Sequence, residues 1–159
     1  MMLDAFNWTY ALIILVFAGP SNIIFAYALA SIFPPKDARV YWGVQAAMIV
    51  LIVATKQYWS TEVAVVVGTA ILVAPPLICL KGPSLAKIVT TVVALIVQLS
   101  AEIPAAFLWI VVVGQPVMSN EAIVAHLLEF LLVVVPFHIL CLSALFWLFA
   151  KACRPLTVR

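Results

Sequence analysis

Five long apolar stretches, separated by short segments, occupy almost all of this 159-residue chain. They run over about residues 6–33, 40–58, 62–80, 85–113 and 120–150. The hydrocarbon layer of a membrane is about 30 Å thick, and about 20 helical residues cross it. Each stretch is therefore long enough to cross. The sequence predicts one all-α domain over residues 1–159, an integral membrane bundle of five transmembrane helices.

The composition supports a membrane location. Hydrophobic residues make up 67% of the chain and charged residues 9%, whereas soluble domains average roughly 45–50% and 25%. The five stretches leave no room for a folded soluble domain. The net charge of +2 comes mostly from the connecting segments and the tail, so we expect membrane lipids as partners and no nucleic acid.

The basic residues are distributed unevenly along the chain. If all five stretches cross a membrane, seven of the eight Lys and Arg residues lie on one side, and Lys56 alone lies on the other. Basic residues in short loops stay on the cytoplasmic side of the membrane. The pattern predicts a multi-pass protein of the cell (cytoplasmic) membrane, with its N-terminus outside and its C-terminus inside.

The first stretch carries an interruption, Gly19-Pro20-Ser21-Asn22. Proline removes a backbone donor, and backbone groups freed at membrane depth need partners from neighbouring helices, hydroxyls or water. One interpretation is a proline kink packed against other helices. The other is a broken helix that lines a site, with Asn22 as a candidate ligand-binding residue.

Two acidic residues lie inside apolar stretches, Glu102 and Glu129. An ionised carboxylate at the membrane centre costs roughly 2.5–3.5 kcal/mol, so both need partners or a proton. Gln98 shares a helical face with Glu102, and His126 precedes Glu129 by three residues, within reach of a hydrogen bond. We expect these four residues either to hold helices together or to form an outward-opening pocket that binds a ligand or a proton.

Signs of catalysis are lacking. His138 and Cys141 share a helical face, but no orienting group or oxyanion stabiliser is evident beside them, so we interpret them as packing residues. All three cysteines are interpreted as structural. The sequence contains no glycine-rich phosphate loop, HExxH motif or metal-ligand spacing. We expect a protein without catalytic residues, metal or cofactor, and not an enzyme.

The predicted turn Phe33-Pro34-Pro35-Lys36-Asp37-Ala38-Arg39-Val40-Tyr41-Trp42, together with the long last stretch that leads to Lys151-Ala152-Cys153-Arg154-Pro155, gives a resemblance in architecture. The chain resembles the multi-span sensor modules of bacterial quorum-sensing-type (GHKL) histidine kinases. The resemblance implies that a helical membrane domain detects a peptide or envelope signal and passes it down the last helix. In such kinases the signal reaches a cytoplasmic dimerisation helix and an ATPase domain.

The chain departs from that family because it has no phosphoacceptor-histidine helix and no ATP-binding boxes. It cannot itself be a kinase, and no binding residue of the family maps onto a single position. We therefore expect a non-catalytic sensing module for a small, peptide or lipid-borne signal, with a cytoplasmic signalling protein or a second copy as partner. The alternatives are a small transporter or channel subunit that uses the intramembrane acids, and an assembly subunit of a larger complex.

Overall fold

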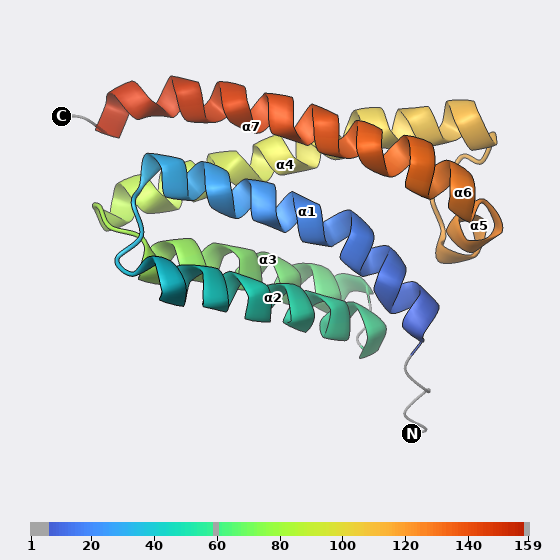
Figure 1. Cartoon of the computed structure of the whole chain (residues 1–159), viewed down its shortest axis with the longest axis horizontal. Coiled ribbons are helices and arrows are strands. Elements are labelled where there is room, and N and C mark those ends of the chain that lie inside the picture. The colour runs from blue at the N-terminus through green and yellow to red at the C-terminus, as the bar shows by residue number, and fades with distance from the viewer. Residues whose placement is uncertain (1–6, 59–60, 158–159) are drawn as a thin grey trace.

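The computed structural model describes residues 7–58 and 61–157, and every regular element within these ranges is a helix (Figure 1). Three short elements, α5 (Asn120–Ala125), α6 (Leu127–Glu129) and the π-helix η1 (Phe130–Val134), lie between the last two long helices. The predicted all-α bundle is confirmed. The long helices are α1 (Trp8–Ile32), α2 (Ala38–Tyr58), α3 (Thr61–Cys79), α4 (Ser84–Val113) and α7 (Val135–Thr157).

The long helices lie side by side and alternate in direction, so the two ends of the chain lie at opposite ends of the bundle (Figure 1). α1 occupies the centre, packing against α7 and α2, while α4 packs against α7 and α3. Phe6, where the first stretch was predicted to begin, falls outside the described residues.

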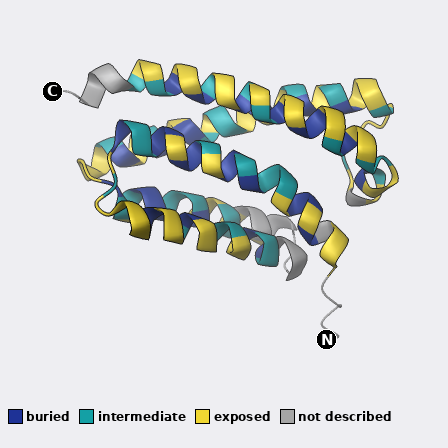
Figure 2. Ribbon diagram, viewed as in Figure 1, coloured by how far each residue is buried: buried dark blue, intermediate teal, exposed yellow. Residues whose placement is uncertain are grey.

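Four segments of the described chain are long and apolar enough to cross a membrane: Ala11–Ile32, Ala38–Thr55, Ser84–Val113 and Leu127–Cys153. Large apolar side chains are exposed along the outside of the bundle (Figure 2), as expected where lipid is the solvent. These helices fit a multi-pass membrane protein. The apolar run described in α3, Val66–Cys79, is shorter, so the fifth crossing stays a prediction.

The α1–α2 and α3–α4 turns lie together at one end of the bundle, which we call the turn end. Two backbone hydrogen bonds join them, from Lys36 N to Cys79 O at 2.8 Å and from Lys81 N to Pro34 O at 2.9 Å. Gly82 has φ +116°, and a Cβ there would lie 3.0 Å from the Phe33 ring. Only glycine fits this conformation and this contact without strain.

Side chains complete the turn end. The Asp37 carboxylate accepts hydrogen bonds from the backbone N–H groups of Arg39 and Val40 at 2.8 and 3.1 Å, and so caps α2. The buried Lys87 ammonium donates to the carbonyls of Leu77 and Leu80 at 2.6 and 3.1 Å. Lys87 thereby provides a hydrogen-bond donor for two carbonyls at the C-terminal end of α3, where carbonyls have no partner within the helix.

The first stretch is a continuous α-helix through Pro20, so the broken-helix interpretation is wrong. The Ser21 hydroxyl donates to the Phe17 carbonyl one turn back at 2.8 Å, inside the helix. Neighbouring helices cover the segment, because both Ser21 and Asn22 are buried. The packed-proline interpretation is the one consistent with this continuity.

The predicted single helix over residues 120–150 is wrong in two respects. It is broken at His126, whose φ of −120° and ψ of 42° are not helical, and residues Phe130–Val134 are π-helical. Pro136 explains the second departure, because it has no N–H for the Leu132 carbonyl. The Val135 N–H instead donates to the Phe130 carbonyl five residues back, and the helix continues beyond residue 150 to Thr157.

The buried apolar side chains form two clusters. The turn-end cluster joins the second half of α1 to the middle of α4 and to the middle of α7, and includes Phe25, Leu29, Leu142 and Phe146. At the opposite end, where residues 114–119 connect α4 to α5, the loop-end cluster includes Ile13, Ala105, Trp109, Phe130 and Val134. A layer of polar side chains lies between the two clusters.

Candidate functional site

The polar layer crosses the bundle where α1, α4 and α7 meet. Ser21 and Asn22 of α1 and His138 of α7 are at most 4% exposed. Buried polar groups in a membrane bundle need partners within the protein, because lipid offers none. The hydrogen bonds of this layer therefore determine how the three helices are held together.

A hydrogen bond links α1 to α7. His138 Nε2 lies 3.1 Å from Ser21 Oγ, and His138 Nδ1 lies 3.3 Å from the Ala101 carbonyl oxygen of α4. The His138 ring also stacks on Phe17, with centroids 4.4 Å apart. One imidazole of α7 thus contacts both α1 and α4 through its two nitrogens and one face.

Two proton arrangements are compatible with these distances. A neutral imidazole has one N–H. If that N–H is at Nε2, it donates to Ser21 while the Ser21 hydroxyl donates to the Phe17 carbonyl. If it is at Nδ1, it donates to the Ala101 carbonyl and the Ser21 hydroxyl turns to donate to Nε2. Rotation of one hydroxyl therefore links the environment of Ser21 to the tautomer of His138.

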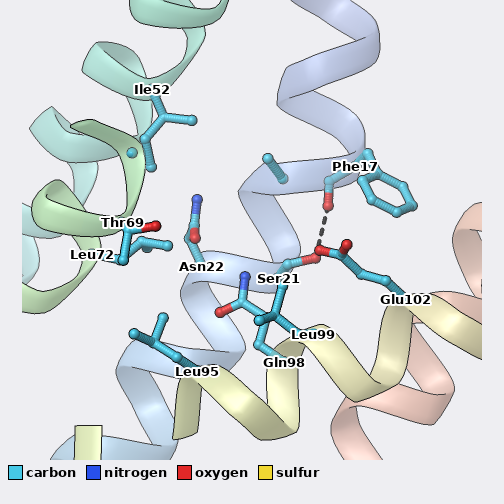
Figure 3. Close-up of a pocket in the computed structure, with 12 residues that line it drawn as sticks. Phe17, Ser21, Asn22, Ile52, Thr69, Leu72, Leu95, Gln98, Leu99 and Glu102 are labelled. Carbon is cyan, nitrogen blue, oxygen red and sulfur yellow. Dashed lines mark hydrogen bonds between the residues drawn. The ribbon is translucent and has the colours of Figure 1, made fainter. Parts of the chain in front are cut away.

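Beside this bond lies a cavity of about 300 Å³ among α1, α2, α3 and α4. Figure 3 shows Ser21, Asn22, Gln98 and Glu102 gathered where α1 and α4 pass each other, with Thr69 approaching from α3. These five residues form the polar part of the lining. The rest is apolar and consists of Phe17, Ala18, Ile52, Gly68, Leu72, Leu95 and Leu99.

The cavity lies near the middle of its helices. Gln98 is 14 residues from the start of α4 and 15 from its end, about 21 and 22 Å at the helical rise. Asn22 is likewise near the middle of α1, 14 residues from its start and 10 from its end. If these helices cross a bilayer, the polar lining is far from both headgroup layers.

The predicted site residues divide into two groups. Asn22, Gln98 and Glu102 line the cavity, whereas His126 and Glu129 do not. The latter pair lies at the loop end, where His126 Nδ1 is 3.7 Å from Glu129 Oε1 and the side chains are 36% and 46% exposed. That distance is too long for the predicted hydrogen bond. The two side chains are neighbours, as predicted, although His126 is the residue between α5 and α6 and does not belong to one continuous helix with Glu129.

One lining atom has no hydrogen-bond partner. The side-chain oxygen of Gln98 is buried and accepts no hydrogen bond. Such an acceptor costs about 1–3 kcal/mol when it is left unpaired. Trp109 Nε1 and Gln45 Nε2 are the other buried unpaired side-chain atoms among the residues that the structure describes, but neither residue lines the cavity.

The sequence analysis missed Ser21, Thr69 and His138 as site residues. For His138 a signal exists, because Val134, His138, Leu142 and Phe146 recur every four residues and all are buried. A histidine within such an apolar stripe requires a polar partner on a neighbouring helix. Cys141, which shares its face in the prediction, is a partly buried free thiol.

The arrangement supports binding through hydrogen bonds. Within residues 7–58 and 61–157, no three His, Cys, Asp or Glu side chains converge as they would around a metal ion. Comparison with family models, with curated proteins and with solved structures gives no match to this chain.

Proposed function

We propose that this chain is a membrane-embedded receptor module that binds a small hydrogen-bonding molecule in its central cavity and relays binding through α7. One observation carries the proposal: Ser21 lines the cavity and also bonds to His138 of α7. A ligand that takes a hydrogen bond from Ser21, or donates one to it, competes with His138. Binding therefore favours one arrangement of α7 over another.

The π-helix provides a place where α7 can move. A π-helical turn holds one more residue than an α-helical turn, and such segments recur at functional sites. Conversion of Phe130–Val134 to α-helix would rotate everything that follows by about 100°, the angle of one residue. His138 lies four residues after this segment, so its bond to Ser21 favours the π-helical register.

The proposed orientation has five crossings, with the N-terminus outside and the C-terminus inside the cytoplasmic membrane. Its support is the distribution of charge in the fold. Lys36, Lys81 and Lys87 belong to the turn end, and the C-terminal end of α7 lies at the same end of the bundle (Figure 1). Lys56 is near the opposite end of α2. The positive-inside rule places the turn end in the cytoplasm.

The proposed partner is a cytoplasmic signalling protein that contacts the end of α7. This agrees with the resemblance to the membrane modules of GHKL histidine kinases, in which the last helix carries the signal inward. A second copy of the chain is a compatible partner, because paired modules would present two α7 ends to one dimeric receiver.

The relay is testable by distance measurement. Spin labels at Arg39→Cys and Ala152→Cys, both exposed positions, would report the separation of α2 and α7 in a background with Cys79, Cys141 and Cys153 changed to alanine. Small amines, alcohols, amides and carboxylates are first screened for thermal stabilisation in detergent. A stabilising compound should shift the label distance by about 1–2 Å or more in lipid nanodiscs, the scale of helix shifts in switching proteins.

His138→Phe is the matched control. It keeps an aromatic ring against Phe17 but removes both ring nitrogens, so the compound should bind without shifting the distance. A compound that binds the parent protein and leaves the label distance unchanged would contradict the relay.

A transporter or channel subunit is the second candidate. The position of the polar cavity at the middle of α1 and α4 favours it, since transporters bind substrates near the bilayer midplane. Proteoliposomes distinguish the two functions. Uptake of the stabilising compound that Glu102→Gln abolishes supports transport, whereas binding without uptake supports reception.

A further inference from the structure

We propose that the cavity ligand is a small primary ammonium compound with a short apolar body. The inference rests on the proposed binding function of this cavity and names its ligand class. Three features of the lining support it: an unpaired acceptor, the sign of its charge, and the size and polarity of the space.

The unpaired acceptor requires a donor. Gln98 Oε1 is buried beside the cavity without a hydrogen-bond partner. Side-chain oxygens of Ser21, Asn22, Thr69 and Glu102 belong to the same lining. An ammonium group has three N–H donors and no acceptor, so it matches a lining that is rich in oxygen atoms.

Acidic and basic side chains are unequally represented in the lining. Glu102 is its one acidic residue, and no Lys, Arg or His belongs to it. Lys87, on the same helix, lies 15 residues away, about 22 Å at the helical rise. An anionic ligand would meet a carboxyl group and no basic side chain, so the lining favours a cation over an anion.

The size of the cavity excludes a bare ion as a complete occupant. Its volume of about 300 Å³ lies at the lower limit of the roughly 300–1,000 Å³ of ligand pockets. Leu72, Leu95 and Leu99 belong to the same lining as the polar groups. A short alkyl or aryl body fits against them while the ammonium contacts the oxygens.

Calorimetry with three probes of similar shape tests the charge preference. The full chain in lipid nanodiscs is titrated with 3-methylbutylammonium, with 3-methylbutanol and with 4-methylpentanoate. We expect the ammonium compound to bind at least about tenfold more tightly than either of the others, a difference of about 1.4 kcal/mol. Glu102→Gln should weaken ammonium binding by at least the same factor.

Two further variants control for folding. Glu129→Gln changes an equivalent group that does not line the cavity, so it should bind the ammonium compound as the parent does. Gln98→Met keeps side-chain length and removes the unpaired acceptor, and weaker ammonium binding by this variant tests the proposal even if Glu102→Gln does not fold.

The outcomes separate this inference from the proposed function. Tighter binding of the alcohol or the carboxylate would overturn the ammonium class while leaving a receptor cavity. Displacement of the amine by an equal concentration of sodium ion would also overturn it, because the apolar body would then contribute nothing. If no probe and no compound of the wider screen binds, the cavity is not a ligand site and both proposals fail.

Discussion

The two ends of the bundle are built differently. At the turn end, backbone hydrogen bonds join two turns, and the Lys36 and Lys87 ammonium groups bond to carbonyls of the 77–80 segment. At the loop end, two short helices and a π-helix follow an exposed connection, and His126 has a non-helical backbone. The turn end therefore has backbone groups of different helices and turns hydrogen-bonded to one another and to lysine side chains, whereas the loop end has a backbone with irregular helical register.

This difference suggests a division of roles. The turn end holds α1, α2, α3 and α4 as a frame, since both turns and the end of α3 share hydrogen bonds. The loop end leaves α7 connected through segments that can change their hydrogen-bond register. We expect local opening to cost less free energy at the loop end than at the turn end.

The largest effect is expected for Lys87→Met at the turn end. Loss of the buried ammonium leaves the Leu77 and Leu80 carbonyls without that donor, and we expect a loss of about 2–4 kcal/mol in unfolding free energy. Unfolding by SDS titration in mixed micelles measures it. Lys81→Met, at an exposed side chain, should change stability by less than about 0.5 kcal/mol; equal effects of the two variants would refute the fixed frame.

The polar layer should contribute less than the turn end. A double-mutant cycle of Ser21→Ala and His138→Phe isolates the energy of the bond between α1 and α7. Hydrogen bonds between membrane helices average about 0.6 kcal/mol and reach about 1.7 kcal/mol, and we expect about 1 kcal/mol here. Additive effects of the two substitutions would mean that this bond does not hold α7 in place.

The sequence predicts the frame better than the site. Apolar length alone locates the long helices, because the hydrocarbon layer requires it. Gln98 and Glu102 were grouped correctly, since residues four apart share a face of the helix. Ser21 and His138 could not be paired from the sequence, because they are 117 residues apart and helical periodicity does not specify which faces of two helices meet.

The departures at the loop end have local causes that hydropathy does not register. His126 and Glu129 were placed in one continuous helix, but the backbone at His126 breaks it, although the two side chains remain neighbours. At Pro136 the fold absorbs the missing N–H by widening the turn before it. Phe130 and Val134, the two ends of this widened segment, are both buried in the loop-end cluster.

Pro136→Ala tests this explanation. An N–H at this position can donate to the Leu132 carbonyl, which favours an α-helical Phe130–Val134 by about 0.5–1 kcal/mol. Rotation of α7 with loss of the bond between His138 and Ser21 opposes the change, so we expect the α-helical register to be populated beside the π-helical one. Hydrogen exchange of the Val133, Val134 and Val135 amides should slow. Pro104→Ala in α4, a helix without a π-helical segment, is the control and should leave those amides unchanged; unaltered exchange in Pro136→Ala would show that proline does not cause the π-helix.

The smallest effect is expected for Glu129→Gln, a substitution at the loop end that can be compared directly with Lys87→Met at the turn end. Its carboxylate is half-exposed and 3.7 Å from His126 Nδ1, and exposed ion pairs contribute roughly 0–1 kcal/mol. We therefore expect a stability change below about 0.5 kcal/mol by the same SDS titration that measures Lys87→Met. A loss as large as that of Lys87→Met would mean that the loop end is as firmly held as the turn end. The free energy for a register change in α7 would then have to come from elsewhere in the bundle.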